Sequence, residues 1–314
     1  MQTGNPYLEG VYAPLTDERT AIPTVIAGEI PRDLAGTYLR NGPNARWAPK
    51  GRYHWFDGDG MLHAMRFEDG TARYRCRWVR TDGFDQEERA KEAVWQGLLM
   101  PTSDNPAGSP YKDTANTDVV VHRGEAMALW YVAGTPYRVD LDTLETLGAA
   151  RFGSDKRFSV SAHAKVDPVT DELMFFDYGR QAPYMHYGVV GADGLLKQLE
   201  PITLPGPRLP HDMAFTERYS VLMDLPVVPD AEAAKKGRWV IRYAQTQPAR
   251  FAILPRHGGD TDVRWFEAAP CYIYHGVNAW EEGDTVVMVG CRTTDPIPAS
   301  DPRDGDPLTA RMMA

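Results

Sequence analysis

The sequence predicts an all-β protein, and a β-propeller is the architecture that suits it best. Short runs rich in β-branched and aromatic residues recur along the chain, and nearly every gap between them contains Gly, Pro, Asp or Asn. At 314 residues the chain is longer than a usual single β-sandwich. No exact repeat and no Trp-Asp blade signature accompanies the runs, so the prediction rests on strand spacing. The predicted strands span residues 36–40, 71–79, 117–122, 173–177, 221–225, 239–243 and 285–289.

Helical patterns are short and few. Residues 85–95 form the one convincing helix, since Asp85 and Glu88 have the spacing of a capping box and Gly97 follows as a C-cap. Residues 231–236 predict a second, shorter helical turn. Neither a low-complexity segment nor a long linker interrupts the chain, so residues 1–314 are predicted to form a single domain.

Composition excludes several classes of protein. The hydrophobic content of 43%, with 25 Pro and 28 Gly, is typical of a folded, turn-rich chain. A net charge of -9 argues against a nucleic-acid partner. The three cysteines, an odd number without CxxC spacing, support neither a disulfide framework nor a thiolate metal site. The N-terminal residues lack a signal-peptide pattern and no run of 18 apolar residues occurs, so a cytoplasmic location is expected.

The stretch WFDGDGMLH at residues 55–63 combines aromatic residues with two Asp-Gly pairs. A calcium-binding EF-hand loop is excluded, because its fifth and sixth positions would be Met61 and Leu62. The Asp-Gly pairs instead predict a hairpin turn at residues 57–60. His63 shares a strand face with Met61, which favours a packed or hydrogen-bonded histidine over a metal ligand.

Three of the eight histidines occur in similar settings. His163, His211 and His275 each lie at a strand-like edge beside small residues or proline, with spacings of 48 and 64 residues. Neutral imidazole is a ligand for iron, copper, zinc and nickel, and ligands from separate strands can converge on a propeller axis. Ordinary core or loop histidines would show the same spacing, so the spacing alone leaves both interpretations open.

Six motifs, in order along nearly the whole chain, resemble the carotenoid cleavage oxygenase family. In addition, residues 5–14 (NPYLEGVYAP) and 114–117 (TANT) are similar to the bacterial lignostilbene dioxygenase branch. The six motifs are GTYLRNGPN at 36–44, WFDGDGMLH at 55–63, TANTD at 114–118, SAHAKVDP at 161–168, LPHDMAF at 209–215 and HGVNAW at 275–280.

The resemblance implies a seven-bladed β-propeller that holds a non-haem Fe(II) through four histidines. It also implies cleavage of a C=C bond by O2 to give two carbonyl products, with a stilbene, carotenoid or apocarotenoid as the hydrophobic or aromatic alkene substrate. His163, His211 and His275 match the first three ligands. Phe56 is then expected as an aromatic wall of the substrate tunnel, with the 57–60 turn close to it.

The chain departs from the family pattern in its ligand set. The resemblance places a fourth histidine far beyond the third, but the 39 residues after His275 contain none. We therefore expect a C-terminally truncated chain of about five blades with short helical insertions, inactive as it stands.

Two further departures concern the segment ALWYVA at residues 128–133. Val132 stands where the family has a glutamate that orients a ligand imidazole. Tyr131 stands where lignostilbene-type members have a lysine that meets a phenolic hydroxyl, so Tyr131 is predicted to contact substrate.

Two alternative functions fit parts of the sequence. A degenerate propeller with a binding or interaction role is favoured by the absent fourth histidine. A metal-dependent hydrolase would need carboxylates converging on calcium, which the histidine-centred motifs do not supply. Trp95 and residues 98–100 could form an apolar lip for substrate entry from a membrane surface, although a core role is the alternative.

Overall fold

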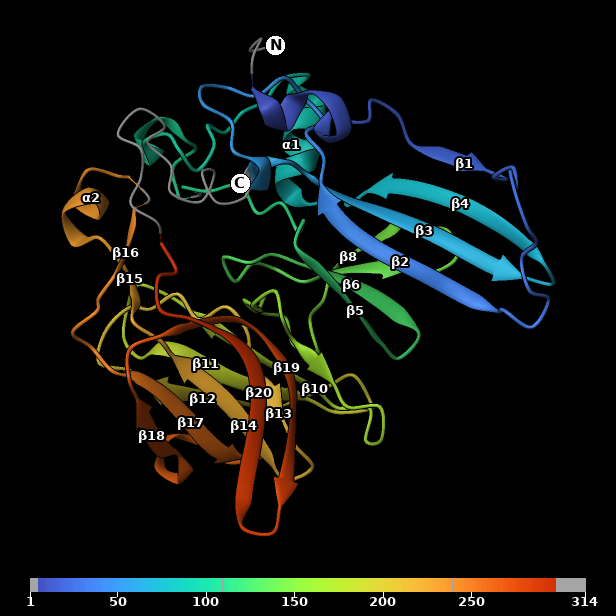
Figure 1. Cartoon of the computed structure of the whole chain (residues 1–314). Helices are drawn as coiled ribbons and strands as arrows, with labels where there is room; N and C mark the ends of the chain where they lie inside the picture. Colours follow the sequence, from blue (N-terminus) through green and yellow to red (C-terminus); the bar gives the residue numbers. More distant parts are fainter. Residues whose placement is uncertain (1–4, 109, 239, 298–314) are drawn as a thin grey trace. The chain divides into compact units, whose positions relative to one another are not determined.

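The computed structural model describes residues 5–108, 110–238 and 240–297, and the chain is mostly β, as predicted (Figure 1). In these residues, four four-stranded sheets and two two-stranded sheets are formed, and all strand pairs are antiparallel. The chain divides into two compact units. Unit 1 runs through Trp130 and includes Gly134–Ala150, while unit 2 contains Tyr131–Ala133 and the residues from Arg151 onward.

Unit 1 contains two of the four-stranded sheets. The first has the order β1-β4-β3-β2 and the second the order β5-β6-β7-β8. Short 3₁₀ turns lie at η1 (Pro6–Leu8), η2 (Gly10–Tyr12), η3 (Trp55–Asp57) and η4 (Thr102–Asp104), and the α-helix is α1 (Asp82–Ala90). The strands are β1 (Arg19–Ala21), β2 (Gly36–Pro43), β3 (Gly60–Glu68), β4 (Thr71–Trp78), β5 (Asp118–His122), β6 (Glu125–Leu129), β7 (Tyr137–Asp140) and β8 (Thr146–Ala149).

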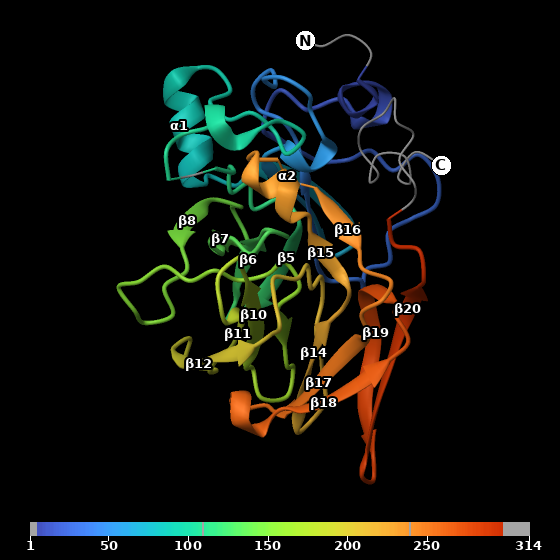
Figure 2. The same cartoon turned by 90° about the vertical axis from the view of Figure 1, so that its left-hand side faces the viewer.

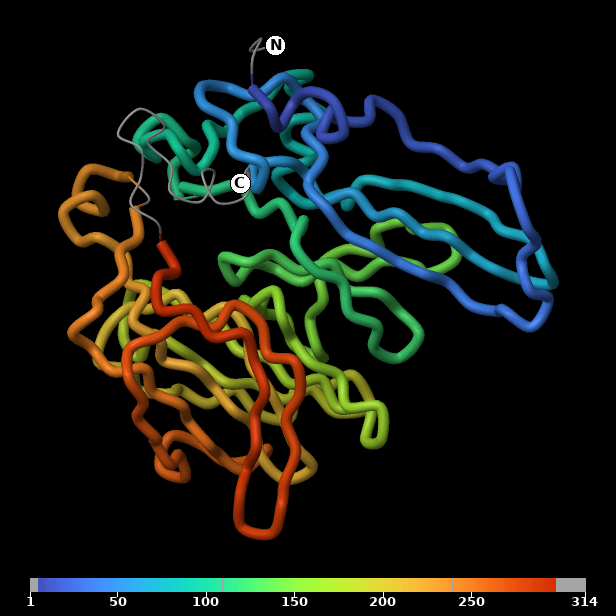
Figure 3. Tube along the Cα trace, viewed as in Figure 1, coloured from blue at the N-terminus to red at the C-terminus, as the bar shows by residue number. Residues whose placement is uncertain are grey.

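Unit 2 contains the other sheets, which follow one another across Figure 2. Their orders are β12-β11-β10-β9, β13-β14-β17-β18, β15-β16 and β19-β20, and β19 and β20 form a long hairpin (Figure 3). The strands are β9 (Lys165–Val166), β10 (Leu173–Tyr178), β11 (Tyr184–Val190), β12 (Leu196–Thr203), β13 (Ala214–Phe215), β14 (Tyr219–Asp224), β15 (Val227–Pro229), β16 (Ile241–Tyr243), β17 (Ala249–Pro255), β18 (Arg264–Ala268), β19 (Tyr272–Glu282) and β20 (Thr285–Thr293). Helix α2 (Ala231–Lys235) and the 3₁₀ turn η5 (Asp260–Asp262) complete the unit.

Each unit has its core between consecutive sheets. In unit 1, Leu62 of β3 packs in one cluster with Ala126 of β6 and Val139 of β7. In unit 2, Phe176 of β10 and Leu222 of β14 share a cluster that joins the two four-stranded sheets. Burial of this apolar surface, at about 25 cal/mol per Å², fixes the face of each strand, so sheets stack face to face as propeller blades do.

Seven strand predictions are met by observed strands, with boundaries shifted by up to a few residues. The strand predicted for residues 239–243 is β16, although Trp239 lies outside the described residues. All three cysteines are unbonded, as expected; Cys76 and Cys271 are buried and Cys291 is exposed. No helix in the described part of the chain is long and apolar enough to span a bilayer.

The predicted hairpin turn at residues 57–60 is wrong. Strand β3 begins at Gly60, opposite Pro43 of β2, so the Asp-Gly pairs end the long connection between those two strands. The tight turn lies instead at Asp69 and Gly70, both at positive φ. Gly60 is needed for close approach, because a Cβ there would lie 2.4 Å from the Ala115 carbonyl oxygen.

The predicted first helix is displaced. Helix α1 begins at Asp82, where the Thr81 side chain caps it by accepting a hydrogen bond from the Phe84 N–H. It ends at Ala90, since Lys91 takes a left-handed conformation with φ 60°. The Glu87 carboxylate then accepts the Val94 N–H at 2.9 Å, so residues 91–95 lie outside the helix. The second predicted helix is confirmed as α2.

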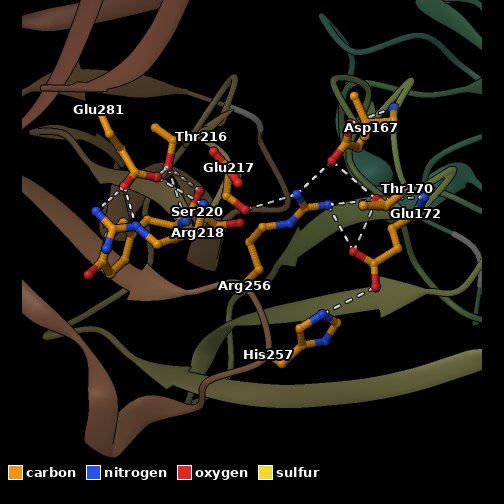
Figure 4. Close-up of polar contacts among 12 residues, drawn as sticks. Asp167, Thr170, Glu172, Thr216, Glu217, Arg218, Ser220, Arg256, His257 and Glu281 are labelled. Atoms are coloured by element: carbon orange, nitrogen blue, oxygen red, sulfur yellow. Dashed lines mark hydrogen bonds and ion pairs between the residues drawn. The ribbon is translucent and has the colours of Figure 1, made fainter.

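A buried arginine joins the two four-stranded sheets of unit 2 (Figure 4). Arg256, which directly follows β17, donates to the Asp167 carboxylate at 2.6 Å and to the Glu172 carboxylate at 2.8 Å. Both acids flank the turn between β9 and β10. The Tyr187 hydroxyl of β11 donates to the Arg256 carbonyl at 3.0 Å, so this contact also crosses between the sheets. These polar contacts fix the two neighbouring sheets against each other.

Candidate metal centre

The three predicted histidines lie in, or shortly before, the first strands of three sheets in unit 2. His163 lies two residues before β9, His211 lies three residues before β13, and His275 lies within β19. Each of these strands is at an edge of its sheet. The packing of unit 2 brings the three histidines to one place.

A bulge presents the third histidine. Strand β19 pairs regularly with β20 up to Ile273, and the register shifts between Ile273 and Gly276, which enclose His275. Bulges bend a strand and re-aim side chains, and they are frequent beside functional sites. In a regular strand, alternation determines which face each side chain points to. The register shift around His275 interrupts this alternation, so the bulge helps to set the direction of the His275 side chain.

The three imidazoles form one compact cluster. One ring nitrogen from each lies within 4.8 Å of the others, and the Nε2 atoms of His163 and His211 are 3.2 Å apart. The ring centroids are 4.8 to 4.9 Å apart in all three pairs. No other group of three metal-ligating side chains forms among the residues that the structure describes.

The separation of the His163 and His211 Nε2 atoms suits a shared metal ion. Two imidazole nitrogens that bind one ion at about 2.1 Å and at a right angle stand about 3.0 Å apart, close to the separation of the two Nε2 atoms. The chemistry of the donor set is also suitable, because borderline metals such as Fe(II), Zn(II) and Co(II) accept imidazole. Three nitrogen donors, and no carboxylate, argue against the calcium-dependent hydrolase considered above.

The electrostatic environment keeps the His211 imidazole neutral. Burial, reinforced by His163, His275 and the cation of Lys165, lowers the pKa of His211 to about 3. A neutral imidazole has a lone pair for a metal, so His211 needs no deprotonation at neutral pH. The His211 ring also lies edge-on to Tyr274, with 5.5 Å between the ring centroids. Packing against Tyr274 restricts the orientation of the ring.

Several residues that hold the cluster were missed by sequence reasoning. The Tyr272 hydroxyl donates to the Leu209 carbonyl at 2.7 Å and so fastens the loop before His211 to β19. Tyr274 contacts the His211 ring from the same strand. The alternation of Tyr272 and Tyr274 just before His275 was the available signal. Asp212 also contributes, because its carboxylate accepts the Gly276 N–H at 2.9 Å.

The two predicted substrate-contact residues have different settings. Tyr131 belongs to unit 2 and lies in a turn after β6, where its carbonyl accepts a hydrogen bond from the Tyr178 hydroxyl. Phe56 belongs to unit 1, where it lies in η3 and lines a pocket with Trp95 and Trp130. The structure therefore brings the three histidines together, and the substrate contacts of Phe56 and Tyr131 stay predictions.

The other histidines have separate partners. His63 lies 2.7 Å from the Tyr74 hydroxyl, which confirms the predicted hydrogen-bonded role. His186 pairs with Asp177 at 2.9 Å, and His257 lies 3.2 Å from Glu172. His54 is buried and its side chain accepts the Phe56 N–H at the start of η3. None of them belongs to the cluster found in the described residues.

Comparison with known proteins gives a consistent result. The family model described as retinal pigment epithelial membrane protein, RPE65, matches residues 12–311. A carotenoid 9,10(9',10')-cleavage dioxygenase of Crocus sativus is 39% identical over 92% of this chain and 57% of its own length. An isoeugenol monooxygenase of Pseudomonas putida is 31% identical over 90% of this chain and 60% of its own.

Among solved structures, the lignostilbene dioxygenase of Pseudomonas brassicacearum superimposes with a TM-score of 0.81 at 32% identity, over 91% of this chain and 61% of that one. The chain thus spans about three fifths of the length of the relatives it matches. Because the family model covers nearly the whole chain, and relatives above 30% identity align with nine tenths of it, the chain belongs to the RPE65 and carotenoid cleavage oxygenase family.

Proposed function

We propose that this chain carries the metal centre of an Fe(II)-dependent oxygenase that cleaves a C=C bond of a conjugated alkene with O2 to give two carbonyl products. The observation that carries the proposal is the cluster of three imidazoles, with one nitrogen of each within 4.8 Å of the others. The family supports the reaction class, since its relatives are named as carotenoid cleavage and lignostilbene dioxygenases.

His163, His211 and His275 would hold the ion. When bound, Fe(II) supplies the activation of O2 that alkene cleavage needs. Three uncharged imidazole donors would leave the full charge of the bound ion in place. The depressed pKa of His211, caused first by burial, keeps this donor unprotonated over the physiological pH range.

The chain is proposed to form a single, incomplete domain of about five blades of a seven-bladed propeller. Four four-stranded sheets and the β19–β20 hairpin support this number. The family resemblance expects a fourth histidine, and in the described residues no fourth histidine joins the cluster. We therefore propose that the 314-residue chain binds metal through three imidazoles and does not turn over substrate by itself.

The proposed substrates are hydrophobic alkenes with a flat conjugated system, including stilbenes, carotenoids and apocarotenoids. The relatives named above act on carotenoids, lignostilbenes and isoeugenol, which share an alkene conjugated to further unsaturation. Phe56 would offer an aromatic face to such a substrate. Tyr131 would offer its hydroxyl as a hydrogen-bonding group to a phenolic substrate. Loss of the expected lysine at position 131 favours an uncharged contact there.

A second candidate is a propeller that has kept the fold for a binding role. The observation in its favour is that only three of the four expected ligands are found in the described residues. Metal content separates the two candidates, because a binding propeller has no need of a metal ion.

The test is anaerobic loading with Fe(II), followed by metal analysis of the folded chain. The wild type is expected to hold about one iron per chain. Each of His163→Ala, His211→Ala and His275→Ala should lose most of it, while the control His186→Ala should keep it, because His186 pairs with Asp177 outside the cluster. A folded wild type without iron would refute the metal centre and favour the binding role. Incubation of the loaded chain with O2 and stilbene or apocarotenoid substrates, followed by mass spectrometry, tests the proposed lack of turnover. No carbonyl products are expected, and their appearance would contradict that part of the proposal.

A further inference from the structure

Asp212 connects the three segments that carry the histidines. It directly follows His211, and its side chain is almost completely buried, with 2% exposure. One carboxylate oxygen, Oδ1, accepts from the Lys165 ammonium at 2.7 Å, and the other, Oδ2, accepts from the Gly276 N–H at 2.9 Å. Lys165 lies two residues after His163, and Gly276 lies directly after His275.

The Asp212 side chain therefore contacts the segments that carry His163 and His275, and its own loop carries His211. A third hydrogen bond, from the Met213 N–H to Oδ1 at 2.8 Å, fixes the carboxylate to its own loop. The loop is also held from its other side, since the Tyr272 hydroxyl of β19 reaches the Leu209 carbonyl. His211 thus lies between two attachment points, Leu209 and Asp212, that both lead to β19.

Only a carboxylate fits this position. The three groups that face Asp212 are all donors, namely an ammonium and two backbone N–H groups. An asparagine would present one acceptor oxygen and one donor NH₂, so one side of the contact would place a donor against a donor. The Asp212 charge also balances the Lys165 cation, which would otherwise repel a divalent ion bound nearby.

We propose that Asp212 is a positioning residue that sets the mutual placement of His163, His211 and His275 through Lys165 and Gly276. It is not counted as a ligand, because it does not belong to the group of metal-ligating side chains in the described residues, and its oxygens accept three hydrogen bonds. This inference rests on the proposed metal centre and deepens it. Groups that orient metal ligands typically change metal affinity about 10- to 100-fold when they are removed.

The test compares Co(II) binding by the full chain and by variants, using the visible spectrum of bound Co(II). Asp212→Asn keeps the size of the side chain and should weaken Co(II) binding about 10-fold or more, with shifted absorption bands. Asp167→Asn is the matched control. Asp167 is also a buried, ion-paired aspartate, but its carboxylate contacts Arg256 and Thr170 and not Lys165 or Gly276. The control should stay within about 2-fold of the wild type, whatever stability it loses.

A milder pair of variants covers the case in which Asp212→Asn does not fold. Lys165→Met should weaken Co(II) binding and Lys165→Arg should restore it, since arginine keeps the cation that Asp212 accepts. Wild-type affinity and an unchanged spectrum in folded Asp212→Asn, or in Lys165→Met if only that variant folds, would overturn the positioning role. A folded wild type that binds neither Co(II) nor Fe(II) would overturn the proposed metal centre itself. The two failures are therefore distinguishable.

Discussion

Replacing Arg256 with methionine removes the cation that joins the two four-stranded sheets of unit 2. Arg256 is buried, with 5% exposure, and its guanidinium contacts Asp167 at 2.6 Å and Glu172 at 2.8 Å. Methionine is similar in length and leaves both carboxylates in place. The variant therefore contains two partly buried acids without their shared cation (Figure 4).

The expected loss follows from burial. Breaking a buried ion pair by removing one partner costs about 3–5 kcal/mol, because the remaining charge stays desolvated. Glu172 is 18% exposed and His257 lies 3.2 Å from it, so water and the imidazole can partly compensate. We expect a loss near the lower limit, about 3 kcal/mol of unfolding free energy. With a urea dependence of about 3 kcal/mol per molar, the unfolding midpoint falls by about 1 M.

The assay is urea unfolding of the full chain, followed by tryptophan fluorescence and circular dichroism. Lys235→Met is the matched control. Lys235 pairs with Glu232, and the two side chains are 70% and 75% exposed. Lys235→Met should therefore lower the free energy of unfolding by less than about 1 kcal/mol. The combined variant Arg256→Met, Asp167→Asn, Glu172→Gln should recover much of the loss, since it removes the unpaired charges. A loss below about 1 kcal/mol in Arg256→Met, or no recovery in the combined variant, would refute the reasoning.

Three further predictions concern pH, packing and metal. Burial alone would raise the pKa of Asp167, but hydrogen bonds from the Val169 N–H and from Arg256 outweigh it and hold the pKa below the ordinary value. Because this pKa is lower in the folded state, the ionised Asp167 stabilises the fold above about pH 4, and the stabilisation is lost as the pH falls further. The free energy of unfolding should therefore fall less steeply with acidification in Asp167→Asn than in the wild type. Gly97→Ala should lower the free energy of unfolding by about 1–3 kcal/mol, because the added Cβ would lie 2.0 Å from an Asp57 carboxylate oxygen. Gly179→Ala is the control, because open space surrounds that position. Equal urea unfolding midpoints in the two variants would contradict the predicted clash. Co(II) at 100 times its dissociation constant should stabilise the wild type by about 2.7 kcal/mol in thermal or urea unfolding, and an equal gain in His211→Ala would place the binding site elsewhere.

Local patterns were sufficient to predict most of the strands. The run at residues 173–177 is apolar and β-rich, and it forms β10, whose first four residues are buried. The three histidines were identified by motif resemblance, and the structure places them in one cluster. Those features depend on residue types and on order along the chain, which a sequence shows directly.

Features that depend on distant contacts could not be predicted. Gly60 was interpreted as a turn glycine, but it is required by the Ala115 carbonyl on another segment. Helix α1 is capped by Thr81 and not by Asp85. Both residue types can cap a helix, and only the surrounding structure selects between them. The partner of Asp212 in β19 is 64 residues away, so no local pattern indicates that contact.

The proposed metal centre requires that three imidazoles of this chain bind one metal ion. X-ray absorption spectroscopy on the chain loaded anaerobically with Fe(II) counts imidazole ligands directly, through scattering from the outer atoms of each ring. Three imidazoles per iron are expected in the wild type. His275→Ala should retain only a small fraction of the iron, and that fraction should show two imidazoles per iron, since His163 and His211 stay in place. An iron surrounded only by oxygen donors, or a ligand count unchanged by His275→Ala, would contradict the proposed metal centre.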